Sequence, residues 1–310
     1  MKHFISVAMA TYNGEKFIEE QLESILNQSC SVDEIIIRDD ISSDNTAAVI
    51  QAFIRNKGIE DKVDFKVNEK NLGYASNFMS ALKKTRGDYV FFCDQDDIWP
   101  EDRVENMIAA LESTPDAVMI GSEFEPFKCD DDAPDVPNWE LSKFVNDGSM
   151  EKLEFNSANI FIGCQGCTMA MKRDFLDKID GYWYEGWAHD EYVWKLALSM
   201  GALYFFHKVT LKRRLHSNNV TLHKEHQKEK RLKYLEDLKK SHEKTLKFIC
   251  DTEGFNCDKA TLLRRHIKAT DLRIGLIRKR MLINSLILLA YGDCYHKKRS
   301  MPVELLMAFK

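Results

Sequence analysis

Short β-branched runs alternate with stretches of helical periodicity along the first 125 residues, and this alternation limits the possible fold more than any other feature. Five runs have the composition of strands: 4–9, 34–38, 63–67, 89–93 and 117–120. Between them, apolar residues recur at helical spacing over 17–26, 44–53, 75–84 and 101–111. Strands separated by helices of this length predict an α/β fold, with a mainly parallel sheet and helices on both faces.

Polar turns follow four of these strands, at residues 10–14, 39–44, 68–73 and 94–97. Ligands of mainly parallel sheets bind beyond the carboxyl ends of the strands. The last turn, Asp94-Gln95-Asp96-Asp97, crowds three carboxylates together, and their repulsion must be offset. Mg²⁺ or Mn²⁺ takes one or two carboxylates together with phosphate oxygens. The pattern therefore favours an enzyme that binds a cation and a diphosphate.

The composition is that of a globular protein of 310 residues, with 44% apolar and 30% charged residues. No apolar run reaches the roughly 18 residues of a membrane span, and the first residues lack a signal peptide. We therefore expect a cytoplasmic protein whose eight cysteines are reduced thiols. Cys164 and Cys167 form a C-x-x-C pair, which fits either a redox or zinc site or two small buried residues.

Charge divides the chain into two unlike parts. Residues 1–207 carry a net charge of −19, whereas residues 208–310 carry +14. Such asymmetry indicates two functionally different regions. The middle of the chain has a Pro- and Asp-rich loop or lid at 126–150, strands near 158–162, 168–171 and 203–206, and a helix over 189–200. Long charged helices are predicted over 225–250 and 257–282, with a shorter one beyond.

The ordered series of motifs resembles a known enzyme family. The motifs are Ala10-Thr11-Tyr12-Asn13-Gly14, Asp39-Asp40, Ser43-Asp44, Asn71-Leu72-Gly73, Asp94-Gln95-Asp96-Asp97, His189-Asp190-Glu191 and the run from Arg214 through His216 to Asn219. Together they resemble a family 2 glycosyltransferase with the GT-A fold, and Asp-Gln-Asp-Asp-Ile-Trp is similar to its rhamnosyltransferase-like branch. The resemblance implies a glycosyltransferase domain over 1–222, with a nucleotide-sugar half (about 1–125) and an acceptor half (about 151–222). It leaves a basic helical region, 223–310, uncovered.

The resemblance also implies an activity. It is the inverting, metal-dependent transfer of a sugar from a UDP- or dTDP-linked donor to a hydroxyl of a polysaccharide, lipid-linked or protein-linked glycan. A sugar-phosphate nucleotidyltransferase is an alternative, but it requires a Gly-rich loop and a Lys that residues 10–14 lack. A non-catalytic partner subunit with the same fold is a second alternative, which broken acidic motifs would favour; here they are intact. No nucleic-acid partner is expected.

For the cation, Mn²⁺ or Mg²⁺, the resemblance implies Asp94 and Asp96 as the D-x-D pair, with Asp96 the direct ligand and His216 a further one. A cation that bridges the two phosphates neutralises charge on the leaving diphosphate. The alternative is a polar turn in which Asp97 caps the helix that follows Pro100.

For the donor, the resemblance implies that Asp39 and Asp40 accept a hydrogen bond from the uracil or thymine ring. The remaining donor-binding residues are Ala10, Thr11 and Tyr12 around the base, with Asn71, Asp94, Gln95 and Arg214. Two alternatives stay open: a turn and helix cap at 39–44, and a basic surface strand at 212–214. Whether Arg213 or Arg214 faces the diphosphate is also open.

For catalysis, the resemblance implies that Asp190 deprotonates the acceptor hydroxyl, with Glu191 as the alternate base. Asp190 is otherwise an acid at a helix N-terminus. Gly166, Trp183 and Trp187 are candidate acceptor contacts, although core packing explains the two tryptophans equally well.

The helical region 223–310 has three interpretations. Its basic runs suit contact with the anionic inner face of the cell membrane, which would make the protein peripheral there. Leu235, Leu238 and similar positions suit a homo-oligomer interface. A solvated helical cap is the third interpretation.

Overall fold

The computed structural model describes residues 3–217, 227–255, 257–297 and 299–309. Asn218 and Asn219, which end one of the motifs, lie outside the described residues, as does the predicted start of a helix at residue 225.

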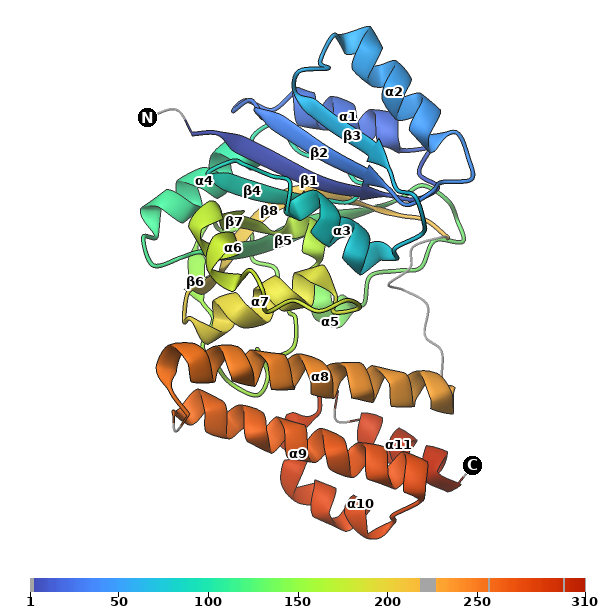
Figure 1. The fold of residues 1–310 in the computed structure, drawn as a ribbon, viewed down its shortest axis with the longest axis vertical. Coiled ribbons are helices and arrows are strands. Elements are labelled where there is room, and N and C mark those ends of the chain that lie inside the picture. Colours follow the sequence, from blue (N-terminus) through green and yellow to red (C-terminus); the bar gives the residue numbers. More distant parts are fainter. Residues whose placement is uncertain (1–2, 218–226, 256, 298, 310) are drawn as a thin grey trace.

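One twisted sheet forms the centre of the molecule (Figure 1). Its strands are β1 (Ile5–Thr11), β2 (Glu34–Asp39), β3 (Val63–Val67), β4 (Tyr89–Cys93), β5 (Met119–Lys128), β6 (Met150–Lys152), β7 (Ala170–Lys172) and β8 (Leu203–Leu215). Their order in space is β3-β2-β1-β4-β7-β5-β8-β6. The pairs among β1 to β4 are parallel, as is the pair β5–β8, whereas β7 and β6 run antiparallel to their neighbours. The prediction of a mainly parallel sheet is confirmed.

Helices cover both faces of this sheet (Figure 1). On one face lie α1 (Ile18–Leu26), α2 (Thr46–Lys57) and α4 (Arg103–Ser113); on the other lie α3 (Tyr74–Leu82), α6 (Arg173–Ile179) and α7 (His189–Ser199). Side chains alternate along each strand, so Val7 and Met9 pack with the first group, while Ala8 packs with the second. Burial on both faces explains the continuous apolar runs of β1, β2 and β4.

The antiparallel strand β7 determines what lies at the functional edge of the sheet. Because β4 and β5 run parallel to each other on either side of it, the chain enters β7 at the edge where they end. The short 3₁₀ helix η1 (Gly166–Thr168) directly precedes β7. This helix therefore lies beside the end of β4 and the turn that follows it.

The C-terminal region packs against the sheet domain through α7 (Figure 1). It consists of α8 (Lys228–Glu253), α9 (Asp258–Lys279), α10 (Ile283–Leu288), the 3₁₀ segment η3 (Leu289–Cys294) and α11 (Ser300–Phe309). Phe248 and Ile249 of α8 join the same core cluster as Trp194 of α7. Within the described ranges, no helix combines the length and apolar character needed to cross a membrane.

Three expectations are wrong in detail. No strand forms over 158–162, because the Asn156 side chain accepts the N–H groups of Ala158 and Asn159 and holds a turn there. The segment 126–150 is not wholly irregular, since it contains the end of β5 and the short helix α5 (Asn138–Leu141). Leu235 and Leu238 are buried within the chain itself and so are not available to a second copy.

A buried ion cluster ties three helices of the C-terminal region together. Glu304 of α11 is fully buried and accepts hydrogen bonds from Arg273 of α9 at 2.7 Å and Arg231 of α8 at 2.5 Å. Removing one partner leaves a buried charge uncompensated.

We therefore expect Glu304→Gln to lower the free energy of unfolding by about 3–5 kcal/mol in urea titrations. Glu236→Gln is the matched control, because Glu236 pairs with Arg278 at the surface and its loss should cost under about 1 kcal/mol. Equal losses in the two variants would contradict the buried cluster.

Candidate active site

The carboxyl ends of the parallel strands bring most of the predicted site residues to one edge of the sheet. In the strand register, Thr11 lies opposite Asp39, and Met9 lies opposite Cys93, so the turn at 94–97 begins beside Ala10. Strand β8 ends at the same edge and delivers Arg214 and His216.

The acidic turn is only partly open to solvent. Carboxylate oxygens of Asp94 and Asp97 and the Cys167 sulfur lie within 4.8 Å of one another. Burial, followed by the charges of Asp96 and Asp97, raises the pKa of Asp94 well above its usual range. Burial and the Asp96 charge raise the pKa of Asp97 to about 7. The cluster thus concentrates carboxyl groups that a positive charge would stabilise in their ionised form.

Asp97 connects three segments of the chain. Its Oδ1 accepts the backbone N–H of Arg214 at 3.0 Å, and its carboxyl also accepts the thiol of Cys167. The side chain is 2% exposed. Asp97 therefore fixes β8 and η1 against the acidic turn.

Asp96 and His216 face each other, with 2.8 Å between Asp96 Oδ2 and His216 Nε2. Both side chains are partly exposed. Carboxylate oxygens, with an imidazole nitrogen as a further ligand, suit Mn²⁺ or Mg²⁺. The thiol of Cys167 does not suit a hard cation, so Asp94, Asp96 and His216 remain the predicted ligands, with Asp97 as their support.

The two arginines of β8 lie on opposite faces of the strand. Arg214 is clamped between the rings of Phe17 and Phe127, each 4.7 Å from its guanidinium carbon. Its Nε donates to the backbone oxygen of Asp96 at 2.8 Å, and its terminal nitrogen pairs with Glu20.

Arg213 instead lies on the side of the acidic cluster. Its positive charge acts to lower the pKa of both Asp94 and Asp97, against the larger effect of burial. Its guanidinium also lies 5.3 Å from the Phe124 ring centre. Arg213 is therefore the cation that partly offsets the charge of the acidic turn.

At the end of β2, the protein's own groups occupy both predicted base-binding carboxylates. Asp39 accepts hydrogen bonds from the hydroxyl of Thr11 at 2.9 Å and from the backbone N–H and hydroxyl of Ser42. Asp40 accepts the backbone N–H groups of Leu72 and Gly73. Asn71 donates to the Asp40 backbone oxygen at 3.1 Å. These bonds attach the 68–73 loop to the end of β2.

The turn after β1 is locked to the acidic turn by one side chain. Gln95 accepts the N–H of Tyr12 at 2.8 Å and donates to its carbonyl at 2.9 Å. A Cβ at Gly14 would collide with Gln95 Oε1, so a larger residue there would displace the Gln95 amide from these bonds. The Tyr12 ring is exposed, and so is Ile41, whose φ of 60° is unusual for a β-branched residue.

Asp190 lies at the start of α7, next to η1. Its Oδ1 accepts the backbone N–H of Glu191 at 2.8 Å. A Cβ at Gly166 would approach Asp190 Cβ at 3.1 Å, so the two backbones meet closely. The Asp190 charge also contributes to the raised pKa of Asp94. The fold thus brings the candidate base and the acidic turn to one site.

Glu191 faces away from this site, into the C-terminal region. Its Oε1 lies 2.5 Å from the buried ammonium of Lys195 and accepts the Ser241 hydroxyl at 3.1 Å. This carboxylate is committed to an internal ion pair, which separates its role from that of Asp190.

The predicted acceptor aromatics differ in their surroundings. Trp187 is 1% exposed and stacks on Tyr184, so it presents no surface to a ligand in this structure. Trp183 is half-buried, and its indole N–H donates to the Trp187 carbonyl. Their contact with an acceptor, like that of Gly166, stays a prediction.

Sequence reasoning missed Tyr74, which is 63% exposed and lies edge-on to His189. Desolvation, then the charges of Asp190 and Glu191, raise the pKa of its phenol. The aromatic directly after Asn71-Leu72-Gly73 was the available signal.

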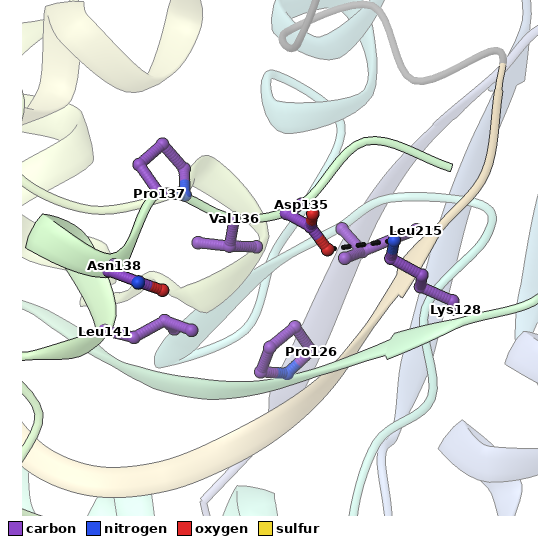
Figure 2. A pocket seen from close by; sticks show the side chains of 8 residues that line it. All are labelled: Pro126, Lys128, Asp135, Val136, Pro137, Asn138, Leu141 and Leu215. Atoms are coloured by element: carbon purple, nitrogen blue, oxygen red, sulfur yellow. Dashed lines mark ion pairs between the residues drawn. The ribbon is translucent and has the colours of Figure 1, made fainter. Parts of the chain in front are cut away.

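A hollow of about 450 Å³ lies where β5 and β8 end, beside the site (Figure 2). Figure 2 shows Pro126, Pro137, Leu141 and Leu215 along its walls and an ion pair between Lys128 and Asp135 beside it. The loop predicted at 126–150 thus forms one wall of a cavity next to the strand that carries His216.

The C-x-x-C pair does not form a thiolate site. Burial raises the pKa of Cys164 to about 12 and that of Cys167 well above its usual value. All eight cysteines are free thiols. Protonated, buried sulfurs fit the structural interpretation of the pair.

This geometry agrees with the family assignment. The family "Glycosyl transferase family 2" matches residues 6–180, more than half of the chain, and the chain belongs to this family.

Its relatives include the dTDP-rhamnosyl transferase RfbG of Shigella flexneri. The two are 41% identical over 106 residues, which cover 33% of this chain and 36% of RfbG. The chain thus spans about a third of that relative's length.

Solved structures share the fold at low identity. S. aureus TarS 1–349 in complex with UDP-GlcNAc superposes with a TM-score of 0.66 and 16% identity, covering 98% of this chain and 89% of TarS. The mannosyltransferase PcManGT from Pyrobaculum calidifontis, in complex with GDP-Man and Mn²⁺, has a TM-score of 0.53 and 18% identity, covering 100% of this chain and 86% of its own. The predicted GT-A architecture is confirmed.

The raised pKa of Asp97 has a consequence for stability. A carboxyl whose pKa rises from 3.8 to about 7 on folding holds its proton more tightly in the folded chain, so its contribution to stability falls as pH rises between these values. Asp97→Asn cannot titrate but keeps an oxygen that accepts the Arg214 N–H. The free energy of unfolding of this variant, minus that of the unsubstituted protein, should therefore increase as pH rises from about 4 to about 7.

Urea unfolding in metal-free buffer at several pH values measures this difference. Asp131→Asn, on the exposed loop, is the control and should show no such trend. A constant difference for Asp97→Asn would contradict the burial of an ionisable carboxyl at this position.

Proposed function

We propose that this chain is an inverting, metal-dependent glycosyltransferase that moves a sugar from a UDP- or dTDP-linked donor to a hydroxyl of a glycan acceptor. The observation that carries the proposal is the meeting of the acidic turn 94–97 and Asp190 at one edge of the sheet, joined through Gly166 and Cys167 of η1. The name of RfbG supports a dTDP-sugar, and the TarS complex supports a UDP-sugar.

Asp94 and Asp96, with His216, would hold Mn²⁺ or Mg²⁺. The raised pKa of Asp94 supports this assignment, because a cation beside it would offset the repulsion among the carboxylates. The bound cation would stabilise negative charge on the diphosphate leaving group. The Mn²⁺ in the PcManGT complex supports metal use within this fold.

Arg213 and Arg214 would have different roles in the site. Arg214 already donates to Asp96 and Glu20 between two aromatic rings, which supports a role in holding the acidic turn in place. Arg213 lies on the side of Asp94 and Asp97, which supports it as the cation that faces the diphosphate. An arginine there would bind phosphate oxygens through charge-assisted hydrogen bonds.

Asp190 would act as the base. An inverting transfer by a single displacement needs one carboxylate that accepts the proton of the acceptor hydroxyl. Asp190 lies in the first turn of α7, at the positive end of the helix dipole. Glu191, paired with Lys195, would position α7 rather than accept the proton.

The donor can be tested without knowledge of the acceptor. We expect Mn²⁺- or Mg²⁺-dependent hydrolysis of one or more UDP- or dTDP-sugars when a panel of nucleotide sugars is incubated with the protein. Asp96→Ala should reduce both turnover and Mn²⁺ binding, measured by calorimetry, because it removes the expected direct ligand. Asp88→Ala, an acid away from this edge, is the control. Full turnover and unchanged Mn²⁺ affinity in Asp96→Ala would refute the metal assignment.

Variants of Asp190 and Glu191 test which of these two adjacent carboxylates is the base. We expect Asp190→Asn to keep donor affinity while transfer falls by about 10²-fold or more, since a positioned base contributes about that much. Glu191→Gln should keep most of the rate and instead lower thermal stability, because it leaves the buried Lys195 ammonium without its carboxylate. A fully active Asp190→Asn, or an inactive but stable Glu191→Gln, would reverse the two roles.

A further inference from the structure

Helix α10 and the residues that flank it expose apolar side chains to solvent instead of burying them. Six apolar residues within nine positions are 42% to 68% exposed: Met281, Leu282, Ile283, Leu286, Ile287 and Leu289. The polar Asn284 is buried instead, and its amide donates to the Leu272 carbonyl at 2.9 Å. We call these six residues the α10 face. Exposed apolar groups gathered in this way mark a binding surface.

A basic groove lies directly beside the α10 face. It has a volume of about 400 Å³ and runs between α9 and α10. Lys268, Arg278 and Lys279 of α9 line it. Its one lining acid, Asp271, pairs with Lys239 at 2.7 Å, and Arg278 pairs with Glu236. Lys268 and Lys279 therefore give the groove a net positive charge next to apolar side chains.

The two features are held together by a close helix contact. A Cβ at Gly275 would lie 2.8 Å from the Asn284 amide nitrogen, so α10 can approach α9 only because residue 275 is glycine. Leu288 of α10 and Leu276 of α9 complete the contact within the same buried cluster. The α10 face and the basic groove are thus one fixed surface and not a loose end of the chain.

We propose that the α10 face and the adjoining basic groove dock this chain onto an anionic lipid bilayer. The exposed leucine and isoleucine side chains enter the boundary between headgroups and acyl chains, while Lys268 and Lys279 contact lipid phosphates. A surface helix with an apolar face and flanking Lys or Arg binds membranes in this manner, and anionic lipid adds to the attraction. The charge of +14 over residues 208–310 acts in the same direction.

Charge distinguishes a bilayer from a second copy of this chain as the occupant. A two-fold interface places the same surface patch on both partners, so the basic groove of one copy would lie near that of the other. Like charges brought together in this way are unfavourable, whereas anionic phosphates neutralise them. This proposal stands on the surface of α9 and α10 and does not depend on the proposed glycosyl transfer.

Flotation of the full chain with vesicles tests the proposal. Vesicles of phosphatidylcholine with 30% phosphatidylglycerol, on the order of the anionic content that gives a strong surface potential, are compared with pure phosphatidylcholine. We expect binding to the anionic vesicles that weakens as salt is raised. The double variants Ile283→Glu/Leu286→Glu and Lys268→Glu/Lys279→Glu should each reduce partitioning about tenfold or more.

Two control variants match these changes elsewhere. Phe255→Glu replaces an equally exposed apolar residue at the turn between α8 and α9, and Lys178→Glu reverses a charge on α6. Both should float like the unsubstituted protein, and all variants should keep its unfolding midpoint because the positions are exposed.

Three outcomes would overturn the proposal. The first is a failure of the full chain to float with anionic vesicles, and the second is equal binding to pure phosphatidylcholine. The third is a dimer, seen by light scattering, that Ile283→Glu/Leu286→Glu dissociates in the absence of vesicle binding; this would assign the α10 face to a second copy.

Discussion

The buried carboxyl of Asp97 is the interaction on which the site depends. It joins three segments that are far apart in the chain: the turn after β4, the backbone of β8 at Arg214, and the thiol of Cys167 in η1. Once these are joined, His216 lies opposite Asp96 and Gly166 lies against Asp190. A carboxyl group has enough acceptor positions for both donors, whereas an amide at this position would keep one oxygen and bring two N–H groups that need partners. The positions of His216 and Gly166 relative to the acidic turn therefore depend on this one buried group.

The alternation of strands and helices determines much of this arrangement, and it can be recognised in the sequence. The runs at β1, β2 and β4 and the polar turns after them predict one sheet edge at which the turns that contain Asp39 and Asp94 come together. The direction of β7 was not visible, because three residues do not reveal whether a strand runs parallel or antiparallel. That direction depends on tertiary pairing with β4 and β5, and it brings Cys167 to the acidic turn. The proposed strand at 158–162 failed for the opposite reason, since one local Asn156 side chain outweighed β-branched composition.

At the proposed donor end of the site, the motif residues could be predicted but their hydrogen-bond partners could not. The motif residues Asp39 and Asp40 were recognised, but their partners were not, because hydrogen bonds to Ser42, Leu72 and Gly73 depend on how two loops fold against each other. Both carboxylates are thereby fixed before any ligand arrives. Groups that are already held in place lose little conformational freedom on binding. The positive φ of Ile41 belongs to the same turn, which suggests that the backbone is held there by the surrounding hydrogen bonds.

Helix α7, which carries the candidate base, is held firmly to the C-terminal region. The buried ammonium of Lys195 contacts Glu191 at 2.5 Å, the Ser241 hydroxyl at 2.7 Å and His242 Nδ1 at 3.3 Å. Burial lowers the pKa of His242 well below its usual value, so its imidazole is neutral and Nδ1 accepts from the ammonium. Displacement of α8 would therefore leave the buried Lys195 ammonium without Ser241 and His242. The loss of stability would be larger than for an exposed ion pair. Since Glu191 directly follows Asp190, the orientation of the candidate base depends on α8 remaining docked. The C-terminal helices thus help to hold the candidate base in place.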